Sequence, residues 1–217
     1  MSACTSSSGE DFGLITANWS FKDLATNTTI TQCPPGTSSA DVHAIRLDGA
    51  GNETSEVYID KYNCNDLTGT SDYPIGTYKV FVDIVGYGQS LSAIVDITAQ
   101  DKTVTVTLVD DGGYFLFDWD LRDAATNAPL TCSEAGNPDS IEITSTLSGT
   151  TQAVADKFNC EDGSGVTGAL LTGSYTISVA ALNASNQALG APQNFSDRLI
   201  GDHNDVTDLG VITLPID

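Results

Sequence analysis

Apolar and polar residues alternate with a period of two along several segments of the chain. The clearest example is residues 115–121, where the apolar positions are Phe115, Phe117, Trp119 and Leu121. Similar alternation runs through residues 15–21, 78–84, 104–108 and 175–181. This period is that of a β-strand with one buried and one exposed face. Each segment is therefore predicted to be a half-buried strand, with Trp19 and Trp119 pointing inward.

Weaker strand candidates lie at residues 42–47, 57–59 and 91–97, separated by Gly, Pro, Asn and Asp. We find no convincing amphipathic helix pattern. Six or seven short strands in about 100 residues, divided by turn residues, are typical of two packed antiparallel sheets. The predicted fold class is therefore all-β, with a β-sandwich favoured and a β-barrel as the alternative.

The sequence contains an internal repeat. Residues 19–27 (WSFKDLATN) match residues 119–127 (WDLRDAATN), 60–64 (DKYNC) match 156–160 (DKFNC), and 76–80 (GTYKV) match 173–177 (GSYTI). Because the matches keep their order and nearly their spacing, the chain is predicted to be a tandem duplication. We expect a flexible N-terminal tether at 1–11, a first domain at 12–109 and a second at 114–217. The joint would be the Asp/Gly segment at residues 110–113, between the two domains.

The charge balance is strongly acidic. With 29 acidic and 8 basic residues, the formal net charge is −21 and the isoelectric point about 4.1. A polyanion would be repelled, so nucleic-acid binding is excluded. The acidity is typical of a soluble exported surface, and it would also attract cations or a basic partner. No apolar run approaches the length of a membrane-spanning helix.

Four of the five cysteines occupy equivalent places in the two repeats, Cys33 with Cys132 and Cys64 with Cys160. Each domain must have been stable alone before duplication, so the economical bridges are Cys33–Cys64 and Cys132–Cys160. The alternative, a zinc site, needs cysteines at close spacing such as C-x2-C, which the sequence lacks. Disulfides predict an oxidising compartment and hence export.

The fifth cysteine, Cys4, has no counterpart in the repeat. Ser2-Ala3-Cys4 resembles the end of a bacterial lipobox, in which the cysteine is lipidated, and residues 5–11 form a polar tether. Thr5 is not the Asp that retains lipoproteins in the inner membrane. These features predict a lipid anchor at Cys4 in the outer membrane, at the cell surface or facing the periplasm. An unpaired thiol is the alternative.

The second half of each repeat resembles a known family. The Gly-x-Tyr segments at Gly76 and Gly173 resemble the G-x-Y-x-v-x-v strand of carboxypeptidase-regulatory-like and Cna-B-like domains. The chain also resembles paired domains of deltaproteobacterial surface lipoproteins, where an F-x-C-x-D-G-x-G turn precedes that strand. The resemblance implies two tandem immunoglobulin-like, prealbumin-like sandwiches. Cna-B domains often carry a Lys–Asn isopeptide bond, but Lys22 has Arg122 as its counterpart, which argues against one.

The chain shows no catalytic constellation. Only two histidines exist, and neither recurs in both repeats: His43 aligns with Ile141, and His203 lies in a polar turn. Neither a nucleophile elbow nor an HExxH motif is present. The protein is therefore predicted not to be an enzyme.

Calcium is the one cofactor that the sequence makes worth considering, because hard cations prefer clustered oxygen ligands. Matching acidic or amide residues follow the second cysteine of each repeat, at Asn65, Asp66, Glu161 and Asp162. Neither segment has the pattern of a calcium loop, and such residues commonly cap turns. Asp110 and Asp111 at the joint are equally weak candidates, so no resident cofactor is predicted.

The favoured function is a non-enzymatic, membrane-anchored envelope or surface lipoprotein that binds a protein or glycan partner, or acts as a spacer. A structural subunit of an extracellular appendage or envelope complex is the alternative. A third possibility, a glycan-binding accessory module, requires an exposed aromatic platform. The candidate rings for such a platform are Tyr58, Tyr62, Tyr73, Tyr87 and Phe195.

Overall fold

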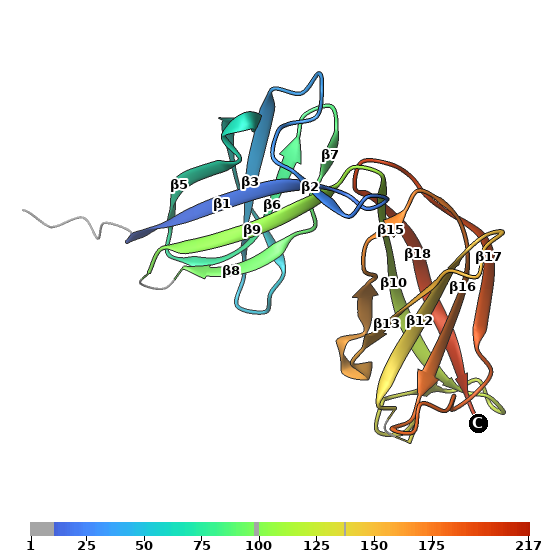
Figure 1. Ribbon diagram of the computed structural model, residues 1–217. Coiled ribbons are helices and arrows are strands. Elements are labelled where there is room, and N and C mark those ends of the chain that lie inside the picture. The colour runs from blue at the N-terminus through green and yellow to red at the C-terminus, as the bar shows by residue number, and fades with distance from the viewer. Residues whose placement is uncertain (1–10, 98–99, 137) are drawn as a thin grey trace, which may run out of the picture. The chain divides into compact units, whose positions relative to one another are not determined.

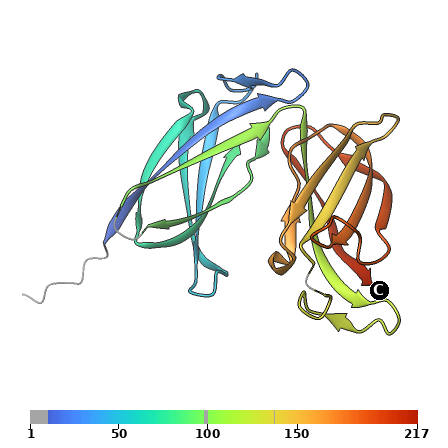
Figure 2. The ribbon, with the colours of Figure 1, turned by 60° about the horizontal axis from the view of Figure 1, so that its bottom comes forward.

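The computed structural model describes residues 11–97, 100–136 and 138–217, and its ribbon is shown in two views (Figures 1 and 2). The chain forms two compact units that divide between Asp110 and Asp111. Each unit consists of β-strands arranged in two sheets and contains one disulfide. The predicted all-β class, with two sandwich domains each closed by its own bridge, is confirmed.

Unit 1 contains sheets A and B. In sheet A the central strand is β1 (Phe12–Asp23), which pairs with β5 (Thr68–Pro74) and β2 (Thr28–Ile30) antiparallel and with β9 (Lys102–Val109) parallel. Sheet B has the order β4 (Glu53–Asn63), β3 (Ser39–Leu47), β6 (Gly76–Ile84), and β6 also pairs with β7 (Gly88–Gln89) and β8 (Ala93–Ile97).

Unit 2 repeats this topology in sheets C and D. Sheet C is built on β10 (Gly112–Asp123), which pairs with β11 (Pro129–Leu130), β14 (Ser164–Val166), β15 (Leu170–Leu171) and, in parallel, β18 (Asp205–Ile216). Sheet D has the order β13 (Ala153–Phe158), β12 (Ser140–Leu147), β16 (Gly173–Leu182), β17 (Gln193–Ile200). Strand β10 begins two residues before the expected domain start at 114.

The alternating residues of the first strand of each unit form the core. In β1 the odd positions from Ile15 to Phe21 are buried, and in β10 those from Phe115 to Leu121 are buried. The two tryptophans point inward, as predicted. The indole N–H of Trp19 donates to the carbonyl of Cys64 at 2.9 Å, and that of Trp119 to the carbonyl of Cys160 at 3.0 Å. Each buried indole therefore has its polar group satisfied.

The second cysteine of each bridge begins a short 3₁₀ turn, η1 (Cys64–Asp66) or η2 (Cys160–Asp162). The Cα atoms of Cys33 and Cys64 are 5.9 Å apart, and those of Cys132 and Cys160 are 6.0 Å apart. Both turns end in a left-handed residue, Leu67 at φ 55° in unit 1 and Gly163 at φ 69° in unit 2. A left-handed conformation suits glycine and is costly for leucine.

Candidate binding surface

An apolar patch lies on the outer face of sheet B in unit 1. We call it the β3–β4–β6 face; it consists of His43, Ile45, Val57, Ile59 and Phe81. Val57 and Ile59 are 49% and 50% exposed. The pairing places His43 between Ile59 on β4 and Phe81 on β6, and it places Ile45 opposite Val57. These side chains thus form two adjacent rows across three strands.

His43 and Phe81 stack face to face in the middle of this patch. Their ring centroids are 4.6 Å apart and their planes differ by 11°. Phe81 is 9% exposed although it points away from the core, because His43 covers it. The histidine packs between two apolar neighbours on the outer face and does not enter the core of the unit.

Unit 2 provides the comparison for this patch, and it corrects the alignment of His43 with Ile141. Lys61 forms an ion pair with Asp41 at 3.0 Å, and Lys157 forms the equivalent pair with Glu142 at 3.5 Å. This correspondence makes Thr144 the counterpart of His43, three residues after Ile141. The alignment was wrong because no sequence match anchors the region between the first cysteine and residues 60–64.

With the corrected alignment, the outer faces of sheets B and D differ in their side chains. Where unit 1 carries the five residues of the β3–β4–β6 face, unit 2 carries small or hydroxyl-bearing residues: Thr144, Thr146, Ala153, Ala155 and Ser178. Inward positions on the neighbouring strand are similar in both copies, with Val80 matched by Ile177 and Tyr78 by Tyr175, and all four are buried. The fold is thus compatible with small or hydroxyl-bearing residues at these five positions, and the larger apolar set is specific to unit 1.

Ion pairs flank the patch at both ends. Lys61 pairs with Asp41 beside His43, and Lys79 pairs with Glu53 at 2.6 Å. Burial acts to raise the pKa of the Asp41 carboxyl, but hydrogen bonds from Lys61 and Ser39 outweigh it and hold the pKa below its usual value of 3.8. The neighbouring carboxylate therefore stays ionised, and its charge is neutralised by Lys61.

The opposite outer face of unit 1, on sheet A, is rich in hydroxyl groups. The hydroxyls of Thr16 and Thr70 are 2.9 Å apart, and those of Ser20 and Thr107 are 3.2 Å apart. These contacts link β1 to β5 on one side and to β9 on the other. The hydroxyl groups line the middle of this face, whereas Phe12 and Leu14 at the start of β1 are 57% and 39% exposed.

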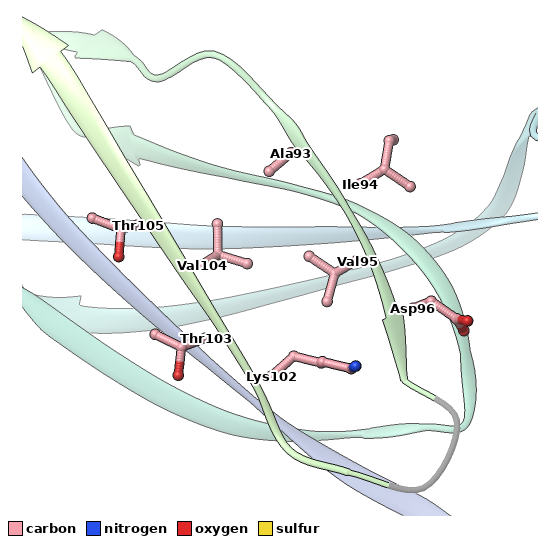
Figure 3. Close-up of a pocket in the computed structure, with 8 residues that line it drawn as sticks. All are labelled: Ala93, Ile94, Val95, Asp96, Lys102, Thr103, Val104 and Thr105. Carbon is pink, nitrogen blue, oxygen red and sulfur yellow. The ribbon is translucent and has the colours of Figure 1, made fainter.

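A shallow groove of about 400 Å³ lies where β8 and β9 run side by side, one in each sheet of unit 1 (Figure 3). Its polar lining includes Asp96, Lys102, Thr103 and Thr105, and its apolar lining includes Val95 and Val104. Figure 3 places Lys102 between the two strands. The groove is the open side of the sandwich, and its lining contains no histidine or cysteine.

The aromatic residues considered for a glycan platform lie against the cores. Tyr73 is 1% exposed, and Tyr58, Tyr62 and Tyr87 pack on the core of unit 1. Phe195 packs on the core of unit 2, with the guanidinium carbon of Arg198 5.4 Å from its ring centroid. These five rings therefore form no exposed aromatic platform. A glycan-binding accessory module would require such a platform.

The residues considered for calcium take part in local structure. The side-chain oxygen of Asn65 accepts a hydrogen bond from the backbone N–H of Cys33 at 3.1 Å, and Asp110 accepts one from the hydroxyl of Tyr87 at 2.6 Å. Asp66, Glu161 and Asp162 lie in the two 3₁₀ turns. Within residues 11–97, 100–136 and 138–217, no three His, Cys, Asp or Glu side chains gather as metal ligands would.

The remaining candidates are placed as follows. His203 has a left-handed backbone, with φ 62°, in the turn before β18, far in sequence from His43. Arg122 pairs with Asp120 at 2.6 Å, and Lys22 lies on the outer face of sheet A, opposite Thr29. Cys4 and residues 1–10 of the expected tether lie outside the described residues. In the described part of the chain, no helix is both long and apolar enough to span a bilayer.

Comparison with known proteins finds no matching family model and no matching curated protein. Solved structures with distant likeness include a leucine-rich repeat protein from Bacteroides thetaiotaomicron, with TM-score 0.42 and 13% identity. That match covers 94% of this chain but only 26% of the larger protein. The minor pilin GBS52 of Streptococcus agalactiae has TM-score 0.34 and 12% identity, covering 94% and 97% of the two chains.

The shaft pilin SpaA of Lactobacillus rhamnosus GG has TM-score 0.31 and 11% identity, with 95% and 99% of the two chains covered. At such low TM-scores, what these proteins do is not carried over to this chain. The assignment of the fold rests on the strand order and disulfides of the two units, and the candidate surface rests on the contrast between them.

Proposed function

We propose that the chain is a non-enzymatic, exported binding module that uses the β3–β4–β6 face to hold a protein partner at the cell envelope. The observation that carries this proposal is the contrast between the copies. Exposed apolar side chains lower solubility and gain nothing for a free monomer, whereas contiguous ones commonly mark interaction sites. Unit 2 keeps the same scaffold without them, so the scaffold does not require them.

Two features support the location. Disulfides form and persist in oxidising compartments, and each unit contains one. The lipobox-like residues before Cys4 favour a lipid anchor in a bacterial outer membrane, facing the surface or the periplasm. A lipid-anchored module with a partner-binding face would hold that partner near the membrane, and unit 2 would act as the second, polar part of the scaffold.

The alternative is a structural subunit of an appendage or envelope complex, in which the same face would bind another copy. The net charge of −21 opposes close packing of identical chains. Sedimentation at high protein concentration separates the two functions. A monomer supports the binding module, and concentration-dependent assembly supports the structural subunit.

Site-specific photo-crosslinking in the producing cells tests the proposal. A photoreactive amino acid replaces Ile59 on the β3–β4–β6 face, and in a matched control it replaces Ala155, the equivalent residue of unit 2. We expect a discrete protease-sensitive adduct from position 59 and none from position 155. Equal adducts from both positions, or none from either, would contradict the proposed function.

A further inference from the structure

Strand β4 is the edge of sheet B next to the apolar face, and it is long for an edge strand. It spans Glu53–Asn63, 11 residues, whereas the equivalent β13 spans only 6. One side of β4 pairs with β3, and among the described residues no strand pairs with its other side. A long open edge presents backbone donors and acceptors to any chain that can lie alongside it.

The hydrogen-bond pattern identifies which groups face the open side. The N–H of Cys64 donates to the carbonyl of Ser38 at 3.0 Å, so the intervening pair Ser39–Asn63 is a non-hydrogen-bonded pair. Such pairs alternate with hydrogen-bonded ones. The residues of β4 whose backbone groups bond to β3 are therefore Tyr58, Asp60 and Tyr62. The N–H and C=O groups of Val57, Ile59 and Lys61 therefore point to the open edge.

Side-chain hydrogen bonds hold this edge strand in place. The hydroxyl of Tyr62 lies 2.5 Å from the hydroxyl of Ser71, and the hydroxyl of Tyr73 donates to the carboxylate of Asp60 at 2.7 Å. Both bonds connect β4 in sheet B to β5 in sheet A. A strand anchored in this way loses little conformational freedom when another strand pairs with it.

The open edge and the apolar face coincide. Val57 and Ile59 turn their side chains to the outer face while their backbone groups point to the open side of β4. Edge strands in soluble proteins are usually shielded by charges, and β4 has them at Glu56 and Lys61. The one charged residue between these two, Asp60, points inward and accepts the hydrogen bond from Tyr73. A strand added there would place every second side chain beside Val57 and Ile59, continuing both apolar rows.

We propose that β4 binds an extended segment of a partner protein as an additional strand of sheet B, a deepening that rests on the proposed binding function. The segment carries apolar side chains at every second position, because those positions join the β3–β4–β6 face. It has a net positive charge, because the chain that receives it carries −21. Backbone pairing provides the attachment, and the apolar rows select the register.

The test uses the full chain and synthetic nine-residue peptides as probes. One peptide alternates valine with lysine and threonine. A second has the same composition in an order without alternation, a third replaces lysine with glutamate, and a fourth carries N-methyl groups on the backbone amides of the first. N-methylation removes the donors needed for strand pairing and leaves the side chains in place. Binding and amide hydrogen exchange are followed by NMR.

We expect the alternating basic peptide to bind, to slow exchange at Val57, Ile59 and Lys61, and to bind at least about tenfold more tightly than the other three. Ile59→Pro removes a backbone donor that faces the open edge, together with the isoleucine side chain of the apolar face, and it spares the ladder to β3. This variant should weaken binding by a similar factor, and Ala155→Pro in unit 2 should not.

Absence of binding by the alternating peptide, equal binding of its N-methylated form, or protection confined to another strand would overturn the proposal. The crosslinking comparison keeps the two hypotheses apart. An adduct at position 59 without peptide pairing leaves the proposed function standing and places the partner on the face alone, whereas no adduct removes the proposed function itself.

Discussion

Replacing Cys33 and Cys64 by alanine removes the bridge that closes unit 1 and leaves unit 2 intact. Alanine is preferable to serine because Cys64 is fully buried, where an unpaired hydroxyl would add its own cost. The carbonyl of residue 64 remains available to the indole of Trp19. The variant therefore removes the cross-link and keeps this hydrogen bond, and the one polar contact it loses is the weak one between the Thr37 hydroxyl and the Cys64 sulfur, 4.0 Å apart.

The size of the effect follows from the length of the loop. The bridged residues are 31 apart in unit 1 and 28 apart in unit 2. On the chain-entropy model, each bridge reduces the entropy of the unfolded unit enough to stabilise it by about 3.6 kcal/mol. The loss is a large share of the stability of a domain of this size. The matched variant Cys132→Ala/Cys160→Ala should lose nearly the same amount, in unit 2.

Native-state hydrogen exchange with mass-spectrometric detection measures both units in one molecule. For the unit 1 variant we expect exchange in β3 and β6 to accelerate by roughly two to three orders of magnitude, with β12 and β16 unchanged. A loss below about 1 kcal/mol would refute the entropy argument. Equal acceleration in both units would refute their independence.

Three further predictions concern single residues. Tyr73→Phe removes the donor to Asp60 and should lower the unfolding free energy of unit 1 by about 1.5–3 kcal/mol in urea denaturation, because a bond to a charged acceptor is lost; an unchanged value would contradict this. Because the folded state lowers the pKa of Asp41, its stabilising effect is complete well above 3.8 and disappears as the pH falls through the folded value. The stabilities of the wild type and Asp41→Asn should converge in acid, and a constant difference would refute the argument. Gly163→Ala should destabilise unit 2 by about 1–2 kcal/mol because φ is positive there, and a thermal melt without a decrease would contradict it.

The sequence was sufficient for the scaffold because the scaffold depends on local alternation and on repetition. Phe115, Phe117 and Trp119 show a period of two, and the matched Cys64 and Cys160 define equivalent bridges. Burial follows directly from such patterns, since an inward face must be apolar in either copy.

The candidate surface could not be found in the same way. Around Val57 and Ile59 the strand also has an inward tyrosine, Tyr58, so apolar residues occupy both faces and the alternation disappears. The position of His43 required the strand pairing, because no sequence match fixes the register near it. One available signal was the contrast between the copies at these strands, where unit 2 has Ala153 and Ala155.

Exposed apolar residues on a sheet edge also explain why the secondary-structure signal at β4 was weak. The expected strand at 57–59 proved to be Glu53–Asn63, because its flanking polar residues belong to an edge with solvent on one side. The feature that made the strand hard to predict is the one that makes it available for pairing.

The central claim is that the β3–β4–β6 face of unit 1 binds a partner, and its most direct test is the native mass of the protein in extracts of the producing cells. Val57→Lys/Ile59→Lys places charges on the face at half-exposed sites, where the fold tolerates them, and Ala153→Lys/Ala155→Lys is the matched control in unit 2. The wild type and the control should sediment in a larger complex, and the face variant as the chain without its partner. Identical sedimentation of all three would contradict the claim.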